Sequence, residues 1–356
     1  MRYLFLLFTI SIIISCSSKK TIAFYENSNN FQLDKDIISQ YISINDNSDD
    51  VYAVYSDMKT LSLKSVSLNE KDQTPNYIDK IDNDPVINPL FGNHFCDTHN
   101  GNEYLVYLDY ENEKKNNLKL LVKNSKNGEW DIFPQKTGSY DFTCAFAKDD
   151  LLLFYYNKMI SCSVLSDRKF TDTGFQLPDT SDIYDLRSIS FNDGIHIFYL
   201  TQDNILNQII LHYDKNTGFN KMSSNVININ VSFYKLFKST DNYYVIFYSS
   251  DKSLDIFDYE SNKKQKIGYF SNLISADMFI NDDDKYFIFS TIQKKKNIKS
   301  YVLSIAYKDG NWKEKPLVNT DNPVQTICTK NINGKIYIVY CNDNLNLITI
   351  NTDQLM

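Results

Sequence analysis

Short runs of consecutive apolar and aromatic residues recur along the whole chain, and most of them end on a tyrosine. The last residues of these runs stand at positions 55, 107, 155, 199, 248, 290 and 340, so neighbouring runs are 42 to 52 residues apart. A spacing this regular indicates seven copies of one structural unit. The runs are Val51–Tyr55, Tyr104–Tyr107, Leu151–Tyr155, Ile195–Tyr199, Tyr244–Tyr248, Tyr286–Ser290 and Ile336–Tyr340.

Each copy repeats the same gradient of polarity. A first strand and a tight polar turn precede the apolar run, which is the second strand and has no polar side. In the third strand apolar and polar residues alternate. The fourth strand is the most polar. In the second copy, Leu118, Leu120 and Val122 alternate with more polar residues. A strand buried on both faces lacks a polar side, whereas an outer strand has one. The gradient and a spacing of about 47 residues predict an all-β fold, a seven-bladed β-propeller, in preference to a β-sandwich.

Glycine positions support strands joined by hairpins. Five of the ten glycines directly follow Asn or Asp, and these dipeptides favour two-residue turns in which both central residues have positive φ. The five pairs are Asn100-Gly101, Asn127-Gly128, Asp193-Gly194, Asp309-Gly310 and Asn333-Gly334. No stretch shows a sustained helical period, and the best helical candidate is the short segment from Leu33 to Ile42.

The seventh copy ends one strand early. Its third strand is predicted at Leu345–Ile350, and six residues follow it. An extra apolar segment, Thr21–Tyr25, precedes the first copy. Because an open ring would expose strand edges, we predict that this N-terminal segment is the outer strand of the last blade and closes the ring. Residues 21–356 would then form a single propeller domain.

Composition and charge exclude several classes of protein. The 356 residues are 42% hydrophobic and 23% charged, so the chain can bury a core and is not intrinsically disordered. It has 37 basic and 44 acidic residues and a net charge of −7. A binder of nucleic-acid phosphates needs a basic face, so we expect no nucleic-acid partner. A closed ring is expected to be a monomer.

The N-terminus carries a targeting signal. After Met1-Arg2, the apolar run Leu4–Ile14 is too short to cross a membrane, which is typical of a signal peptide. It ends in Ile13-Ile14-Ser15-Cys16, which resembles the lipobox of bacterial lipoproteins. The resemblance implies a signal peptide over residues 1–15, a lipid on Cys16 that anchors the chain in a membrane, and a tether over 16–20. Ser17 after the lipid-bearing cysteine implies the outer membrane or the cell surface.

Five cysteines remain if Cys16 carries lipid, and five cannot all pair in disulfides. Their pairing stays open for Cys96, Cys144, Cys162, Cys328 and Cys341. Metal-capable side chains gather at His94, Cys96 and His99, but a closed site would need a further ligand. Cys96 also belongs to a column of small residues that recurs in other copies. We therefore interpret these cysteines as packing residues and predict no metal site.

Aspartates follow the apolar runs in five copies. In a propeller, these turns share one face with the loops that enter the innermost strands. An acidic ring on that face could bind a cation, an amine or a basic partner, whereas the alternative is the ordinary preference of turns for Asp and Asn. The candidate ligand-binding residues are Asp57, Asp109, Asp203, Asp251 and Asp343. The acidic stretches Asp46–Asp50 and Asp282–Asp284 lack EF-hand spacing and are interpreted as turns.

No catalytic constellation is evident, and no cofactor motif is present. Ser125–Trp130 resembles a degraded Asp-box of sialidase-type propellers, enzymes that hold a substrate carboxylate with three arginines. This chain has only Arg2, Arg168 and Arg187, and Arg2 lies in the signal peptide, so sialidase activity is excluded. The sequence therefore predicts a lipid-anchored envelope or surface lipoprotein that acts as a non-catalytic binding or scaffold propeller, with an envelope protein or a glycan as partner. The alternative is a glycan-active hydrolase or lyase that uses loop carboxylates as acid and base.

Overall fold

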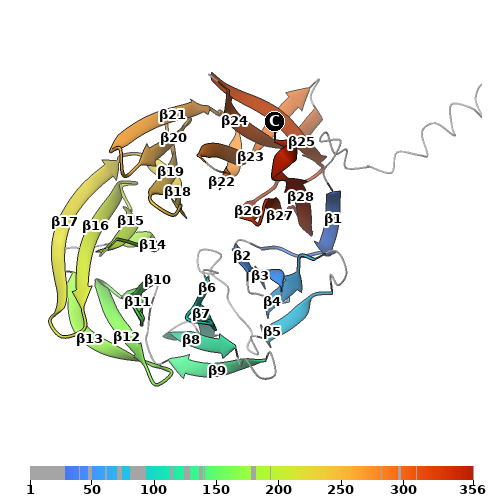
Figure 1. Ribbon diagram of the computed structural model, residues 1–356. Coiled ribbons are helices and arrows are strands. Elements are labelled where there is room, and N and C mark those ends of the chain that lie inside the picture. The colour runs from blue at the N-terminus through green and yellow to red at the C-terminus, as the bar shows by residue number, and fades with distance from the viewer. Residues whose placement is uncertain are drawn as a thin grey trace, which may run out of the picture.

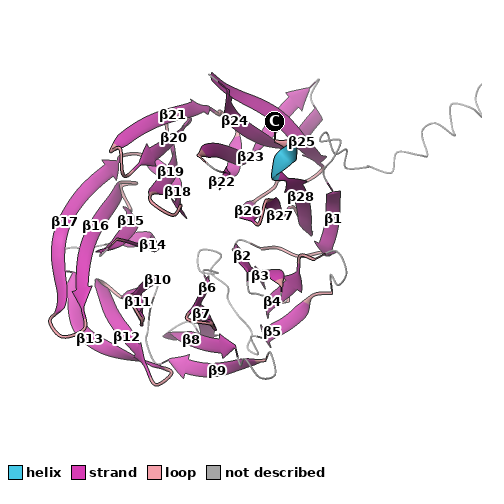
Figure 2. Cartoon of the chain, in the orientation of Figure 1, coloured by secondary structure: helices cyan, strands magenta, loops and turns pink. Residues whose placement is uncertain are grey.

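Figure 1 shows the computed structural model, in which seven antiparallel sheets form a closed ring. The structure describes residues 29–355 except 40, 47–49, 61, 70–73, 81–93, 113–114, 124–128, 136–138, 140, 178–181, 193, 282, 296–297 and 310. Strands dominate these residues, and the helical element is one short turn, Thr352–Gln354 (Figure 2). No helix among the described residues has the length and apolar character that a membrane crossing requires. The predicted seven-bladed β-propeller is confirmed.

Each blade has four strands, numbered here from the inside of the ring to the outside. Blades 1, 2 and 3 comprise β2 (Ile42–Asp46), β3 (Val51–Asp57), β4 (Ser62–Ser67), β5 (Asn76–Lys80); β6 (His94–His99), β7 (Asn102–Asn112), β8 (Lys115–Lys123), β9 (Trp130–Gln135); and β10 (Asp141–Ala147), β11 (Asp150–Tyr156), β12 (Ile160–Ser166), β13 (Lys169–Leu177). Blades 4 and 5 comprise β14 (Ile183–Phe191), β15 (Gly194–Thr201), β16 (Leu206–Asp214), β17 (Gly218–Asn228); and β18 (Val231–Lys238), β19 (Tyr243–Ser249), β20 (Ser253–Asp258), β21 (Lys263–Tyr269). Blades 6 and 7 comprise β22 (Leu273–Asn281), β23 (Asp284–Lys295), β24 (Ile298–Asp309), β25 (Asn311–Thr320); and β26 (Thr326–Ile332), β27 (Lys335–Cys341), β28 (Leu345–Asn351), β1 (Asn29–Asp34).

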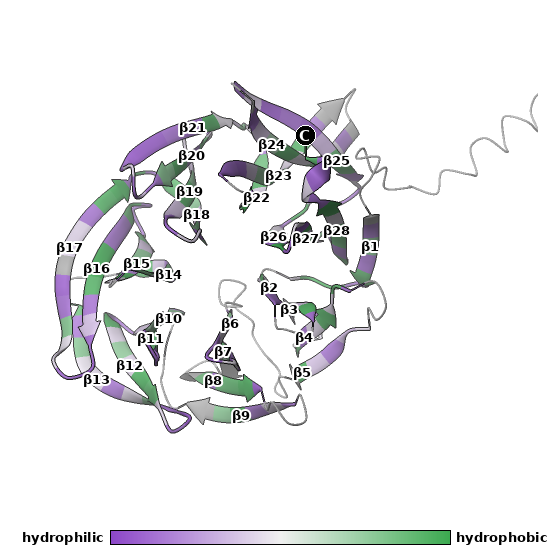
Figure 3. Cartoon of the chain, in the orientation of Figure 1, coloured by the Kyte–Doolittle hydropathy of each residue, from purple (hydrophilic) through white to green (hydrophobic). Residues whose placement is uncertain are grey.

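Burial follows the predicted gradient of polarity across each blade. Every residue of β19, the second strand of blade 5, is buried, whereas the first four residues of the outermost strand β21 are exposed. Figure 3 shows this change in hydropathy from the second strands to the outermost ones. The second strand is covered on both faces by the neighbouring blades, which is why its sequence has no polar side.

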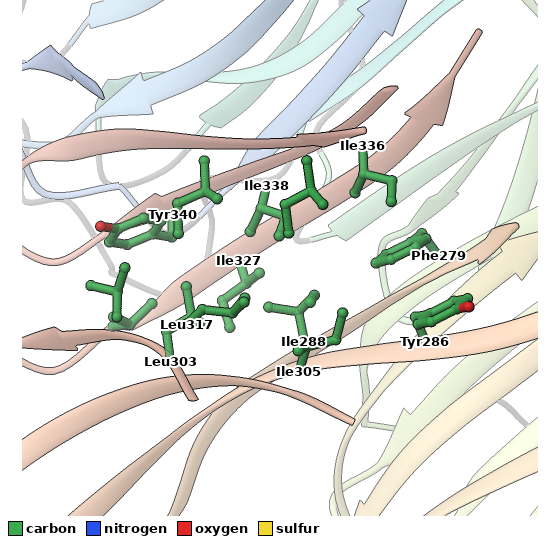
Figure 4. Packing of buried hydrophobic residues seen from close by; sticks show 14 of the residues in the cluster. Phe279, Tyr286, Ile288, Leu303, Ile305, Leu317, Ile327, Ile336, Ile338 and Tyr340 are labelled. Atoms are coloured by element: carbon green, nitrogen blue, oxygen red, sulfur yellow. The ribbon is translucent and has the colours of Figure 1, made fainter. Parts of the chain in front are cut away.

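The hydrophobic core is divided among the seven seams between neighbouring blades. Each of the seven buried clusters takes its residues from two adjacent blades. Figure 4 shows the seam between blades 6 and 7, where Ile288, Leu303 and Ile305 pack against Ile327 and Ile338. The apolar runs that mark the seven copies in the sequence are therefore the residues that hold the blades together.

An N-terminal strand closes the ring, as predicted. The strand β1 pairs antiparallel with β28, with Phe31 opposite Leu347, so the first and last described strands lie side by side (Figure 1). The closing residues are Asn29–Asp34 and not Thr21–Tyr25, which lie outside the described residues. Leu33 is buried in the seam between blades 7 and 1, so the closing strand supplies an apolar side chain to the core.

The helix considered for Leu33–Ile42 is wrong. Leu33 and Asp34 end the strand β1, and Asp36 adopts a positive φ of 53°, which interrupts regular backbone structure. Ile37 is then buried in the same seam as Leu33, with its backbone N–H bonded to the carbonyl of Asp343. The apolar spacing that suggested a helix instead reflects an irregular segment whose side chains Leu33 and Ile37 both enter the same seam.

Candidate functional site

A cavity of about 660 Å³ opens at the centre of the ring. Its walls come from the innermost strands of five blades, namely β2, β14, β18, β22 and β26, and β18 contributes six consecutive residues, Phe233–Lys238. The volume lies in the range of small-molecule sites, about 300–1,000 Å³. Because the innermost strands of a propeller face its axis, the lining is fixed by the blades themselves and not by loops.

Lys235 connects three blades across this cavity. Its Nζ lies 3.3 Å from Asp277 Oδ1 in blade 6 and donates to the carbonyl of Ile327 in blade 7 at 2.6 Å. Asp277 also accepts hydrogen bonds from the backbone N–H of Thr329 at 2.6 Å and from its hydroxyl at 3.2 Å. Burial raises the pKa of Asp277, and the charge of Lys235 opposes that rise. The charge on each side chain is thus balanced by a group from another blade.

A second charged group joins blades 3 and 4. Arg187 Nε donates to Asp185 Oδ1 at 2.8 Å within β14. Asp141, at the start of β10, accepts from the backbone N–H of Leu186 at 2.6 Å and from that of Phe142 at 2.8 Å. Burial raises the pKa of Asp141 to about 7, and the nearby charge of Asp185 adds to the rise. The pKa of Asp141 thus lies well above that of an ordinary aspartate.

These contacts limit the chemistry that the cavity can perform. Acid–base cleavage of a glycan needs one carboxyl group that can donate a proton and another that can attack or activate water. Asp277 and Asp185 each form an ion pair, and both oxygens of Asp141 accept backbone hydrogen bonds. The raised pKa of Asp141 is typical of a catalytic acid, but Asp141 is not among the residues that line the cavity. The pair of Lys235 and Asp277 joins neighbouring blades, whereas the pair of Arg187 and Asp185 lies within β14.

The predicted acidic residues stand in five different blades. Antiparallel pairing places the turns after the second strands on the face where the innermost strands begin. Asp203, Asp251 and Asp343 are exposed in such turns. Asp109 lies in β7, and its side chain is outside the described part of the structure. Each exposed aspartate belongs to its own blade, so the face carries separate charges and not one cluster.

Asp57 differs from the other four because it is buried, with 1% of its surface exposed. Lys64 Nζ lies 2.9 Å from Asp57 Oδ2 and 3.2 Å from Asp34 Oδ2 of the closing strand. Burial favours a raised pKa for Asp57, but hydrogen bonds from Thr60, Lys64 and the backbone of Lys59 outweigh it and hold the pKa below its usual value. Asp57 thus shares the internal cation Lys64 with Asp34 of the closing strand.

Two of the exposed aspartates accept hydrogen bonds from nearby polar groups. Asp251 accepts hydrogen bonds from the backbone N–H and the hydroxyl of Ser253, at 2.9 and 2.7 Å. Asp343 accepts from the side-chain amide of Asn322 at 2.7 Å. Turn chemistry therefore accounts for Asp251, whereas Asp343 links two neighbouring connections of the last blade.

The structure separates the metal-capable residues of β6. His94 Nε2 lies 2.9 Å from Ser43 Oγ, and the ring of His99 stacks on Phe146 with centroids 4.2 Å apart. Cys96 packs in the seam between blades 1 and 2. Within the described residues, no three His, Cys, Asp or Glu side chains gather closely enough to hold a metal ion.

All five cysteines of the described chain are free thiols in or beside the seams. They are Cys96, Cys144, Cys162, Cys328 and Cys341. Each belongs to, or packs against, one of the hydrophobic clusters between blades. Burial raises the pKa of Cys328 to about 12 and also raises that of Cys144, so these thiols are protonated and unreactive at neutral pH.

Sequence reasoning missed a second cavity, a cleft of about 650 Å³ between blades 1 and 2. Tyr52 and Tyr77 line it from blade 1, and Lys123 and Trp130 line it from blade 2. Trp130 stood out in the sequence only as the end of a degraded Asp-box. The sequence feature that comes closest to indicating this cleft is the presence of aromatic residues in the polar outer strands. Nothing in the sequence, however, pairs Tyr77 with a tryptophan 53 positions further on.

No protein-family profile and no curated protein matches this sequence. Among solved structures, a mutant of AofleA from Arthrobotrys oligospora aligns with a TM-score of 0.51 and 13% identity over 82% of this chain and 92% of its own. A candidate 6-phosphogluconolactonase from Bacteroides uniformis aligns with a TM-score of 0.51 and 14% identity over 86% of this chain and 91% of its own. The polysaccharide lyase Uly1 aligns with a TM-score of 0.47 and 11% identity over 77% and 93%. At these identities the first two likenesses show a shared fold and nothing further.

Proposed function

We propose that this chain is a non-catalytic binding or scaffold propeller that is held at a bacterial outer membrane or cell surface by a lipid on Cys16. The observation that supports a binding role over catalysis is the pairing inside the central cavity. There Asp185 and Asp277, the two carboxylates among the described lining residues, each form an ion pair. Such a cavity offers fixed polar groups for recognition but lacks two carboxyl groups ready for acid–base work.

The face that carries the turns after the second strands is the proposed contact surface for a basic partner. Asp203, Asp251 and Asp343 are exposed there in three different blades. The chain as a whole has a net charge of −7, so its field favours the approach of cationic groups. An envelope protein with a basic surface fits this proposal.

Replacement of Cys16 is expected to release the chain from membranes. Cys16→Ala removes the thiol that would carry the lipid, because an alanine cannot form the thioether. Metabolic labelling with a fatty-acid analogue is expected to mark the wild-type chain and leave the variant unmarked, and the variant is expected to leave the detergent phase. Cys144→Ala is the matched control and is expected to keep the label. Equal labelling of the Cys16→Ala variant and the wild type would refute the anchor.

The absence of catalysis is expected to appear as unchanged polysaccharides. Incubation of the purified chain with neutral and acidic polysaccharides is expected to release no reducing ends and no unsaturated uronates above a heat-denatured control. The glycan-active alternative is favoured by one observation, the raised pKa of Asp141 beside Asp185. If cleavage occurs, falls as the pH rises through about 7 and is abolished in Asp141→Asn, then Asp141 acts as a general acid and the non-catalytic proposal is wrong.

A further inference from the structure

The cleft between blades 1 and 2 contains a lysine, Lys123, that already interacts with a carboxylate and with two aromatic rings. Lys123 Nζ lies 3.0 and 3.1 Å from the two carboxylate oxygens of Glu103. It also lies 5.0 Å from the ring centroid of Tyr52 and 5.8 Å from that of Trp130. The hydroxyl of Tyr52 donates to Glu103 at 2.5 Å, and Glu103 is buried. Lys123 is therefore a fixed part of the wall, neutralised by Glu103.

The lining of the cleft disfavours an anionic ligand and offers a ligand cation no vacant cation–π position over Tyr52 or Trp130. Asp50 and Glu129 line it, so an anionic ligand would meet two further carboxylates. A ligand cation would gain most from the faces of Tyr52 and Trp130, but Lys123 already lies within cation–π distance of both rings. Those ring positions are therefore already taken. A neutral ligand that carries both apolar and hydrogen-bonding surface needs neither a free cation–π position nor a free positive charge.

The rest of the lining suits a hydroxyl-rich ligand. Tyr77 is 61% exposed as a residue, and the Nζ of Lys64 lies 5.2 Å from the centroid of its ring. Ser65 and Asn76 line the same cleft and carry hydroxyl and amide groups that donate and accept hydrogen bonds, and Ser67, whose hydroxyl donates to Asp50 at 2.9 Å, keeps its capacity to accept. A pyranose ring presents C–H groups on one face, which pack on an aromatic ring, and hydroxyls around its edge. In this cleft the aromatic ring of Tyr77 is available to the C–H face, and the polar side chains are available to the hydroxyls.

We propose that the cleft between blades 1 and 2 is a binding site for a neutral oligosaccharide. The cleft volume of about 650 Å³ has room for more than one sugar ring. The site lies at a blade seam away from the central cavity, so it goes beyond the function proposed above and does not depend on lipidation. An envelope polysaccharide is a source of such a ligand, and a free oligosaccharide is another.

The two tryptophans of the chain allow a direct test. Trp312 packs against Phe287 with ring centroids 4.9 Å apart, and its buried Nε1 has no hydrogen-bond partner among the described residues. Trp312→Phe therefore removes no hydrogen bond and leaves Trp130 in the cleft as the only tryptophan. The full chain in a detergent without a sugar head group is titrated with neutral gluco-, galacto-, manno- and N-acetylglucosamine oligomers. A saturable change in Trp130 emission is expected with at least one of them.

Substitutions at the cleft distinguish this site from others. Tyr77→Ala is expected to weaken binding about tenfold or more, because it removes the exposed aromatic platform. Asn76→Ala, which is less able to disturb packing, is expected to weaken binding about threefold. Tyr269→Ala is the matched control, since Tyr269 is 68% exposed and lies with Lys266 Nζ 3.8 Å from its ring centroid in blade 5. This control is expected to bind like the parent.

Three results would overturn the proposal. The first is that no neutral oligomer changes the emission of Trp130 at concentrations up to about 10 mM, the weak end of specific binding. The second is that Tyr77→Ala and Asn76→Ala both bind like the parent. The third is that acidic oligosaccharides or lysine-rich peptides bind in the cleft in place of neutral sugars. Vesicles that display the polysaccharide then separate the two sources, because only an envelope polysaccharide would retain the chain at the surface after Cys16→Ala.

Discussion

A chain that lacks Asn29–Asp34 is expected to lose the stability of the whole ring and not of one blade. The deletion removes Leu33 from the seam between blades 7 and 1 and leaves the edge of β28 unpaired. An exposed strand edge also promotes association with other chains. Leu33→Ala alone is expected to lower the free energy of unfolding by about 3 kcal/mol, the usual cost of a cavity in a core.

Thermal melts followed by circular dichroism, with size-exclusion chromatography, measure both effects. Deletion of residues 21–28 is the matched control, because it shortens the chain upstream of β1 and keeps the pairing of β1 with β28. That control is expected to melt at the temperature of the parent. If the two deletions cost the same, β1 is not sufficient to close the ring. If deletion of Asn29–Asp34 leaves the melting temperature unchanged, the closing strand has no role in stability.

Lys64→Met is expected to lower the free energy of unfolding by about 3 kcal/mol. Lys64 is 6% exposed and is the cation shared by Asp57 and by Asp34 of the closing strand. Its removal leaves the buried carboxylate of Asp57 without a counter-charge, which is the costly way to break an internal ion pair. Chemical denaturation at pH 7 measures the loss. Lys59→Met is the control, because Lys59 pairs with Asp36 in solvent, and its effect is expected to be much smaller.

The same pair gives the wild-type chain a defined pH dependence. The folded pKa of Asp57 lies below its ordinary value, so its contribution to stability is present above the unfolded pKa of about 3.9 and is lost as the pH falls through the folded pKa. The pKa of Lys64 is raised despite its burial, because its hydrogen bonds to Asp57 and Asp34 outweigh desolvation. Its contribution is present below about pH 10.4 and is lost as the pH rises through the folded pKa. In a plot of unfolding free energy against pH, Asp57→Asn is expected to remove the loss of stability at acidic pH that Asp57 causes. Asp203→Asn is expected to keep that loss.

The architecture was predictable because it repeats. Seven apolar runs at similar spacing report seven strands that are covered on both faces, and this burial leaves a direct signature in the sequence. That an N-terminal strand closes the ring was predictable, because the last copy lacks a strand. Which residues form that strand was not predictable. Phe31 and Leu33 give β1 only two apolar residues, a weaker signal than the continuous apolar stretch at Thr21–Tyr25.

The candidate sites were less predictable because they depend on contacts between blades. Asp57 is the last residue of β3 and is buried beside Lys64, whereas Asp203 lies two residues beyond the end of β15 and is exposed. The sequence pattern presents both simply as an aspartate that closely follows an apolar run. Tyr77 and Trp130 likewise come from neighbouring blades, and only the seam brings them to one cleft. The periodic pattern fixes which strands exist and carries little information about the side chains that meet across a seam.

The pairing of β1 with β28 also sets the order in which the molecule can be completed. Phe31 lies opposite Leu347, so a strand made near the start of synthesis waits for 316 further residues before it finds its partner. The first six blades are each continuous in the chain and can form as they emerge, whereas the seventh requires both ends. Until β28 has been made, β1 is an unpaired extended segment that a protease or a chaperone can bind. Protection of residues 29–34 is therefore a single local signal that synthesis has reached the last blade and that the ring has closed.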